Sequence, residues 1–126
     1  TLAHMNGKRS PFDWKKVGVD IVDEVIADRL RKHYEYGEKV IIVSGRDASC
    51  RVETEKWLLD NNIPYFDLMM REVNDCRKDS IIKKEIYENI ILPKYNILFA
   101  YDDREQVVKT IRKLGIKCFQ VNPGNF

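Results

Sequence analysis

The sequence predicts an α/β fold in which a parallel sheet is covered on both faces by helices. Helical and strand patterns alternate from residue 20 to residue 121. The predicted strands are short apolar runs rich in β-branched residues, as expected for strands buried on both sides. Such an order favours parallel strands joined by right-handed crossovers. At 126 residues, the chain is predicted to form a single domain, 1–126.

Four helices and four strands are predicted, and their ends follow from capping residues. The first helix begins at Asp20 as N-cap and stops at Gly37, and the third begins at Asp79 as N-cap. The second covers 49–60, and the fourth runs from residue 104 to Gly115. The strands are predicted at 39–43, 65–70, 97–101 and 117–121. The apolar residues expected to face the core are Ile21, Val25, Ile26, Ala27 and Leu30 in the first helix, Val52, Trp57 and Leu58 or Leu59 in the second, and Ile81, Ile82, Ile86 and Ile90 in the third.

Composition excludes several classes of protein. The net charge of +2 gives no global basic field of the kind that attracts nucleic acid, so any such binding needs a local patch. The three cysteines are odd in number and show no C-x-x-C spacing, which predicts reduced thiols in a cytoplasmic protein. The apolar runs are too short to span a membrane, and no signal peptide is recognised.

Three polar segments follow predicted strands. They are Ser44-Gly45-Arg46, the loop 71–79 and Asp102-Asp103. In parallel sheets, ligands bind beyond the carboxyl ends of the strands, so these segments are expected along one rim.

The adjacent carboxylates of Asp102 and Asp103 have two interpretations. Mg²⁺ takes oxygen ligands and usually binds one or two carboxylates with water and phosphate oxygens. Alternatively, Asp103 is the N-cap of the fourth helix and Gln106 completes a capping box. The two interpretations are compatible, because Asp103 can cap the helix while Asp102 and Asp103 bind the metal.

The other polar residues also allow a simple structural interpretation. Ser44 and Arg46 offer a hydroxyl and a guanidinium to a phosphate, or they form an ordinary turn. Lys83, one turn into a helix, reaches a phosphate or is an exposed helix lysine. The basic residues at 8–16, with Phe12 and Trp14 between them, suit a nucleic-acid strand or a surface loop.

Taken together, the motifs resemble a known family. I-I-V-S-G-R, R-K-D-S-I-I-K-K-E-I and A-Y-D-D-R-E-Q-V-V occur in the order seen in the haloacid dehalogenase-like phosphatase superfamily, from its second motif onward. With M-N-G-K-R-S-P-F-D and the terminal C-F-Q-V-N-P-G-N-F, the chain most resembles the 3′-phosphatase domain of phage-type polynucleotide kinase–phosphatase. The resemblance covers essentially the whole chain and implies a three-layer, Rossmann-like fold.

The resemblance implies a role for each matching residue. Ser44 and Lys83 would hold the transferring phosphate, and Asp102 and Asp103 would bind Mg²⁺. The substrate-binding residues would be Arg9 in the flap, Arg46 and Asp79. Because the flap motif is one residue longer than the family pattern, Lys8 can take the place of Arg9.

One part of the family pattern is missing. The family attacks phosphorus with the first aspartate of D-x-D-G-T, uses the second as general acid and base, and forms an aspartyl-phosphate. Thr1 matches the last residue of that motif. The first strand and both aspartates are therefore expected upstream of Thr1, and the 126 residues alone are expected to be inactive.

The function expected from the resemblance is removal of 3′-phosphates from DNA or RNA ends, in a protein that also carries an upstream kinase domain. No G-x-x-x-x-G-K-[ST] motif occurs in these residues. Two alternatives stay open: a phosphatase of small phosphate esters, or a catalytically dead binding module.

Overall fold

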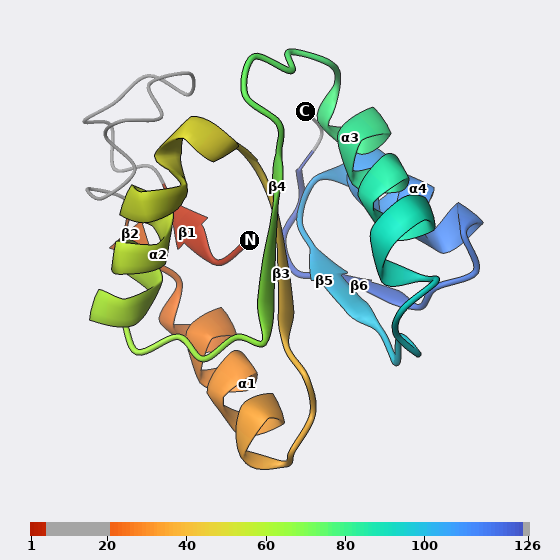
Figure 1. Cartoon of the computed structure of the whole chain (residues 1–126). Coiled ribbons are helices and arrows are strands. Elements are labelled where there is room, and N and C mark those ends of the chain that lie inside the picture. The colour runs from red at the N-terminus through yellow and green to blue at the C-terminus, as the bar shows by residue number, and fades with distance from the viewer. Residues whose placement is uncertain (5–20, 125–126) are drawn as a thin grey trace. The chain divides into compact units, whose positions relative to one another are not determined.

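The computed structural model describes residues 1–4 and 21–124. They divide into two compact units, one formed by Leu2–Asp75 and the other by Thr1 with Cys76–Phe126. Each unit is described separately (Figure 1).

The first helix of the Leu2–Asp75 unit starts later than predicted. A short antiparallel pair, β1 (Ala3–His4) and β2 (Ile21–Val22), precedes α1 (Glu24–Glu35). Asp23 is the N-cap, and its carboxylate accepts hydrogen bonds from the backbone N–H groups of residues 25 and 26. The predicted cap at Asp20 is wrong because residues 21–22 are extended. The predicted stop is confirmed, since Gly37 has the positive φ of +82° that favours glycine after a helix.

The strand before Ser44-Gly45-Arg46 continues through that segment. β3 spans Ile41–Asp47 and pairs in parallel with β4 (Asp67–Arg71). The register shifts between Ser44 and Asp47, so the strand absorbs the extra residues in an irregularity and pairs again at its end. The predicted end of this strand at residue 43 is therefore wrong.

Helices α1 and α2 cover the β3–β4 pair (Figure 1). A 3₁₀ turn (Ala48–Cys50) leads into α2 (Arg51–Asp60). Trp57 and Leu58 are buried as predicted, whereas Val52 and Leu59 are 76% and 75% exposed. The buried core of this unit consists of Ala27, Trp57, Leu58, Ile63 and Leu68.

The other unit combines parallel strands with helices that pack on each other (Figure 1). Its elements are α3 (Asp79–Ile86), a π-helix (Tyr87–Ile91), β5 (Ala100–Asp102), α4 (Glu105–Lys113) and β6 (Cys118–Gln120). β5 and β6 are parallel, with Asp102 opposite Gln120. Gly115, with a φ of +86°, follows α4 as predicted. The buried side chains include Ile82, Ile86, Val107, Val108 and Ile111.

The parallel pairs confirm the α/β class. Each parallel sheet holds two strands among the described residues, β3–β4 and β5–β6. One continuous sheet, a three-layer arrangement and a first strand upstream of Thr1 stay predictions. The single domain also stays a prediction.

Two of the exclusions drawn from composition can be compared with the structure. No helix within residues 1–4 and 21–124 is long and apolar enough to cross a membrane. Cys50, Cys76 and Cys118 form no disulfide in the part of the chain that the structure describes.

Candidate functional site

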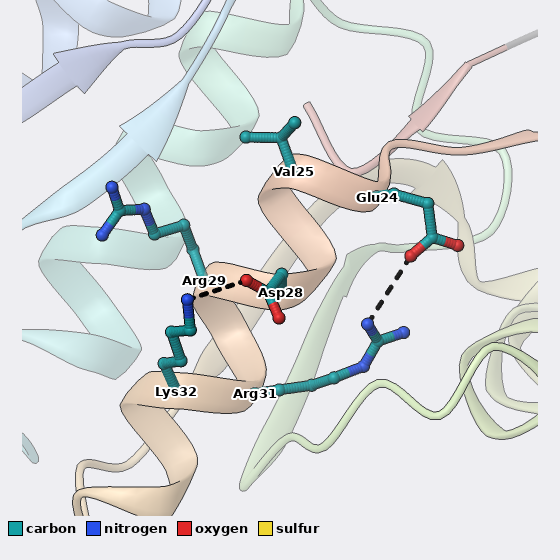
Figure 2. Close-up of a pocket in the computed structure, with 6 residues that line it drawn as sticks. All are labelled: Glu24, Val25, Asp28, Arg29, Arg31 and Lys32. Carbon is teal, nitrogen blue, oxygen red and sulfur yellow. Dashed lines mark ion pairs between the residues drawn. The ribbon is translucent and has the colours of Figure 1, made fainter.

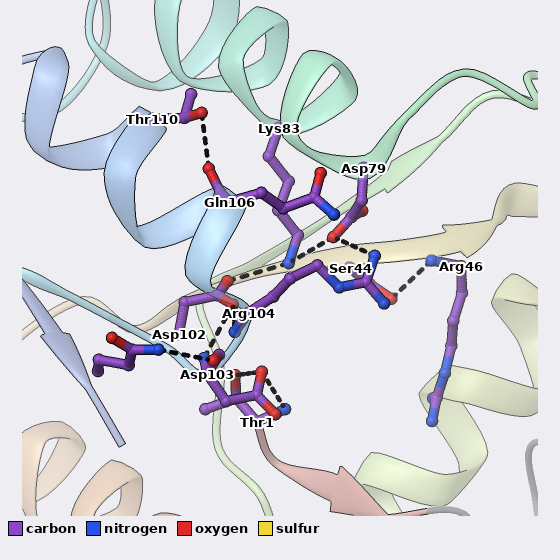
Figure 3. Close-up of polar contacts among 11 residues, drawn as sticks. Thr1, Ser44, Arg46, Asp79, Lys83, Asp102, Asp103, Arg104, Gln106 and Thr110 are labelled. Carbon is purple, nitrogen blue, oxygen red and sulfur yellow. Dashed lines mark hydrogen bonds and ion pairs between the residues drawn. The ribbon is translucent and has the colours of Figure 1, made fainter. Parts of the chain in front are cut away.

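Asp102 is a buried carboxylate at the end of β5. Its side chain is only 8% exposed. Oδ1 accepts hydrogen bonds from the backbone N–H groups of Asp103 (2.9 Å) and Arg104 (3.0 Å). Oδ2 accepts a hydrogen bond from the Lys83 ammonium at 3.0 Å (Figure 3). A buried charge is tolerated when it is paired and hydrogen-bonded in this way.

Lys83 is buried as well, so its interpretation as an exposed helix lysine is wrong. Its Nζ lies 3.0 Å from Asp102 Oδ2 and 3.4 Å from Asp79 Oδ2. Burial alone would lower the pKa of Lys83, but the two carboxylates outweigh burial and raise it above its ordinary value. Lys83 therefore carries a fixed positive charge.

Asp79 lies in the same network rather than at a helix cap. The N-cap of α3 is Lys78, so the predicted capping role of Asp79 is wrong. Asp79 is the first residue of the helix, and its carboxylate lies 3.4 Å from both Lys83 Nζ and Arg104 NH1. This buried carboxylate thus holds two cations near Asp102.

Arg104 was missed as a site residue. It directly follows the acidic pair in the A-Y-D-D-R motif, which was the available signal. It is also the N-cap residue of α4, with φ −77° and ψ 118° and no side-chain capping bond. The backbone N–H of Arg104 donates to the Asp102 carboxylate, and this bond fixes the start of the helix. The Arg104 guanidinium, at the end of the side chain, reaches Asp79 (Figure 3).

Asp103 does not cap α4, so the predicted capping box with Gln106 is wrong. The Asp103 carboxylate accepts a hydrogen bond from the Thr1 hydroxyl at 3.1 Å. With its side chain 25% exposed, this carboxylate is open to solvent.

Two neutral side chains complete the surroundings of Asp102. Tyr87 and Cys118 are both buried. Burial, and then the charge of Asp102, raise the pKa of the Tyr87 hydroxyl and of the Cys118 thiol. Both groups therefore stay protonated, and they add no further charge beside Asp102.

Ser44 and Arg46 belong to the Leu2–Asp75 unit and are described within it. Ser44 Oγ accepts a hydrogen bond from the Arg46 backbone N–H at 3.1 Å. The central carbon of the Arg46 guanidinium lies 5.9 Å from the centroid of the Trp57 ring, which is within the range of a cation–π contact. The serine hydroxyl therefore shapes the irregular segment of β3.

Asp47 is a second residue that sequence reasoning missed. It is buried, and its carboxylate accepts backbone hydrogen bonds from Ser49 and Asn74, each at 2.8 Å. The Ser49 bond is the main cause that lowers the pKa of Asp47, and the Asn74 bond adds to it, while burial opposes both. Asn74 has a positive φ of 65°. Asp47 thus ties the end of β3 to the loop after β4, and an acidic residue directly after S-G-R was its only signal.

The comparison with known proteins decides the family. The family model described as the polynucleotide kinase PNKP phosphatase domain matches residues 1–126. The chain belongs to this family. The predicted resemblance to polynucleotide kinase–phosphatase is therefore confirmed.

Relatives of this phosphatase-type domain are longer proteins. The structures titled "Structure of the Pnkp1/Rnl/Hen1 RNA repair complex" and "Structure of Pnkp1/Rnl/Hen1 complex" each contain a chain that is 42% identical over the whole of this one, with a TM-score of 0.95. This chain covers 40% and 44% of those chains. A protein of Autographa californica nuclear polyhedrosis virus, named as a bifunctional polynucleotide kinase/RNA ligase, is 33% identical over 78 residues. That match covers 61% of this chain and 11% of the viral protein.

The acidic pair suits a magnesium ion. Asp102 accepts three hydrogen bonds, and an ionised carboxylate has room for roughly four, so one position is left. The Asp103 side chain is part-exposed. Within residues 1–4 and 21–124, no group of three or more His, Cys, Asp or Glu is placed to hold a metal. Two adjacent carboxylates fit Mg²⁺, which needs few protein ligands.

The predicted flap residues, Arg9 and its alternative Lys8, lie outside the described residues. So do the basic and aromatic residues from 12 to 16.

A hollow of about 530 Å³ lies along α1 (Figure 2). Two ion pairs occupy most of its charged side chains: Glu24 lies 3.6 Å from Arg31, and Asp28 lies 3.0 Å from Lys32. Because both carboxylates are paired within the same helix, we assign no site there. The residues that line the hollow are Glu24, Val25, Asp28, Arg29, Arg31 and Lys32.

Proposed function

We propose that the chain is the Mg²⁺-dependent phosphatase domain of a polynucleotide kinase–phosphatase, and that it removes 3′-phosphates from DNA or RNA ends. The observation that carries this proposal is the buried Lys83–Asp102 pair at the carboxyl end of β5, in a chain that belongs to this family. Burying a lysine between two carboxylates is energetically costly, because removing each charge from water costs several kcal/mol. Perturbed charge clusters of this kind are typical of functional sites.

In this proposal Asp102 and Asp103 hold the metal. Mg²⁺, when bound, neutralises negative charge on the phosphoryl oxygens. The single position left on Asp102 and the part-exposed Asp103 carboxylate support such binding. The adjacent N–H groups of residues 103 and 104 fix the Asp102 carboxylate before the metal arrives.

Lys83 is proposed to contact the phosphate that is transferred. Its ammonium stays charged, so it stabilises the negative charge that the equatorial oxygens carry during transfer. Asp79 is proposed to orient both Lys83 and Arg104 through its two ion pairs. Ser44, Arg46 and Arg9 (or Lys8) are assigned phosphate contacts on the strength of the motif resemblance alone.

We propose that the carboxylate that accepts the phosphoryl group, and the acid/base two residues after it, belong to a D-x-D-G-T motif ending at Thr1. The Thr1 hydroxyl already bonds Asp103, which supports placing the end of that motif beside the proposed metal ligands.

The similar proteins support a role in nucleic-acid repair. One set of solved structures is titled an RNA repair complex, and the viral relative is named as a polynucleotide kinase/RNA ligase. We propose that this domain likewise works beside a kinase domain on nucleic-acid ends. A cytoplasmic location remains a prediction.

The experiment measures phosphate release with Mg²⁺ by two polypeptides, the 126 residues and a form extended N-terminally by the residues encoded upstream. Each receives a 3′-phosphorylated oligonucleotide and a sugar phosphate. The proposal predicts activity only in the extended form and a higher kcat/KM for the oligonucleotide. Preference for the sugar phosphate would favour a small-ester phosphatase. If the extended form is folded but hydrolyses neither the oligonucleotide nor the sugar phosphate, the result would favour a binding module.

A further inference from the structure

We infer that the cleft beside Asp103 is a subsite for the terminal nucleoside of the substrate, and this inference rests on the proposed function. The cleft has a volume of about 410 Å³, within the range of small-molecule sites. Nothing in the motifs assigns it a role. The residues that line it are Glu105, Gln120, Val121, Asn122, Pro123 and Gly124.

The walls of the cleft are bonded directly to the acidic pair. The Gln120 side chain donates from Nε2 to the carbonyl oxygen of Asp103 at 3.2 Å. The Val121 N–H donates to the carbonyl oxygen of Asp102 at 3.1 Å. These two bonds hold the cleft at a fixed place beside the proposed metal ligands.

The far side of the cleft is fastened to α4. The Glu105 N–H donates to the carbonyl oxygen of Gly124 at 2.6 Å. The segment after β6 is thereby held at both ends against the residues that follow Asp102 and Asp103. Backbone bonds thus hold this segment in place, while the Gln120 side chain, whose Nε2 donates to Asp103, keeps its amide oxygen for a ligand beside the exposed Asn122 amide.

The topology places the cleft where the esterified sugar has to be. Asp102 and Gln120 are paired at the carboxyl ends of β5 and β6, which is the edge where parallel sheets bind ligands. A 3′-phosphate is joined to its sugar through one ester oxygen. A nucleoside whose phosphate is held at Asp102 and Asp103 therefore lies close to these two residues, and the cleft is bonded to the backbone of both.

The chemistry of the lining matches a nucleoside and not a phosphodiester backbone. Gln120 and Asn122 are exposed amides, which can both donate to and accept from sugar hydroxyls and base edges. Among the residues that line the cleft, none is Lys or Arg, and Glu105 is acidic. Glu105 pairs with Lys109 at 3.4 Å, outside the lining. A polyanionic strand would meet no cation there, whereas an uncharged sugar and base would find hydrogen-bonding partners.

The test uses the N-terminally extended polypeptide with Gln120→Ala, Asn122→Ala and the double variant. Substrates are a 3′-phosphorylated oligonucleotide, a nucleoside 3′-monophosphate and p-nitrophenyl phosphate, which has no nucleoside. Loss of one or two hydrogen bonds predicts that KM rises roughly tenfold for both nucleotides. It predicts a change below about twofold for the aryl phosphate. Asn89→Ala is the control, because Asn89 is an exposed amide of the same unit outside the cleft. This variant should leave KM unchanged for the nucleotides and for the aryl phosphate.

An equal rise in KM for the nucleotides and the aryl phosphate, or no rise for any substrate, would overturn the subsite. If the extended wild type hydrolyses none of the three, the proposed function fails on its own. In that case NMR of the side-chain amides with nucleoside 3′-monophosphate decides the subsite. Shifts at Gln120 and Asn122 but not at Asn89 would support it, and unchanged signals would overturn it.

Discussion

The ammonium of Lys83 lies 3.0 Å from Oδ2 of Asp102, and both side chains are about nine-tenths buried. This pair joins α3 to the end of β5, two elements that are distant in sequence. Asp79 adds a second carboxylate at 3.4 Å from the same ammonium. The proposed chemistry and the stability of this unit thus depend on the same three side chains.

Replacing Lys83 with Met should strongly destabilise the protein. The methionine leaves Asp102 and Asp79 buried without the central cation, and breaking a buried ion pair costs about 3–5 kcal/mol. Urea unfolding of the extended polypeptide measures this loss. Lys84→Met is the matched control, because Lys84 is exposed and its pairing with Glu88 at 3.7 Å should contribute less than about 1 kcal/mol. Similar losses for both variants would contradict the account.

Arg104→Ala should lower phosphatase activity more than stability. Its guanidinium is part-exposed and lies 3.4 Å from Asp79, which also orients Lys83. We expect a loss of about 10–100-fold in kcat, in line with the removal of groups that orient a site. The free energy of unfolding should fall by less than about 1 kcal/mol. Arg77→Ala removes an exposed pair with Glu85 and should leave kcat unchanged. A kcat of Arg104→Ala at the wild-type value would refute this positioning role.

Arg31 is expected to hold the end of α2. Its side chain donates to the carbonyl oxygens of Asn61 at 2.7 Å and Asn62 at 3.1 Å. Arg31→Ala loses both charge-assisted bonds and should cost about 2–4 kcal/mol, at about 1–2 kcal/mol for each bond. Arg29→Ala, on the exposed side of the same helix, should cost less than about 0.5 kcal/mol. Thermal unfolding compares the two, and equal melting temperatures would show that the Arg31 bonds contribute nothing.

Asp47 should make stability fall at low pH. Its folded pKa lies below the ordinary value of 3.8, so its contribution is fully present above that value. The contribution is lost as pH falls from about 3.8 through the lower folded pKa, because the protonated carboxyl binds the Ser49 and Asn74 N–H groups less well. Asp47→Asn is neutral at every pH and should be less stable than wild type near pH 7 but show a smaller decline on acidification. Parallel stability–pH curves for the two proteins would be evidence against this role.

Much of the fold followed from apolar periodicity, but the helix starts did not. Asp20, Asp79 and Asp103 are all good N-cap types by local propensity. In the structure the caps are Asp23, Lys78 and Arg104. Asp79 and Asp103 have tertiary partners instead, Arg104 and the Thr1 hydroxyl. Capping preference depends on neighbouring residues only and does not take account of partners that are distant in sequence. The wrong helix starts at Asp79 and Asp103 therefore lie in the proposed site.

The proposed site residues were identified from their resemblance to family motifs and not from the periodicity of apolar residues. Spacing alone favoured an exposed Lys83, because a lysine in a helix is ordinarily solvated; its burial depends on Asp102, 19 residues away. Arg104 and Asp47 went unassigned since their roles come from contacts with Asp79 and Asn74, which only the folded chain brings close. Val52 was placed inside, and Leu58 and Leu59 were left as alternatives, because periodicity over one short helix does not fix which face is buried.

The most direct test of the central claim is phosphate release from a 3′-phosphorylated oligonucleotide by the extended polypeptide and its Asp102→Asn variant, with Mg²⁺ or with EDTA. Asn at 102 keeps the volume but removes the charge that Lys83 and the metal share. We predict release by the wild type that EDTA abolishes and added Mg²⁺ restores, and a loss of at least about 100-fold in the variant. Undiminished release by a folded Asp102→Asn protein, or in EDTA, would contradict the assignment of Asp102 as a metal ligand in a 3′-phosphatase.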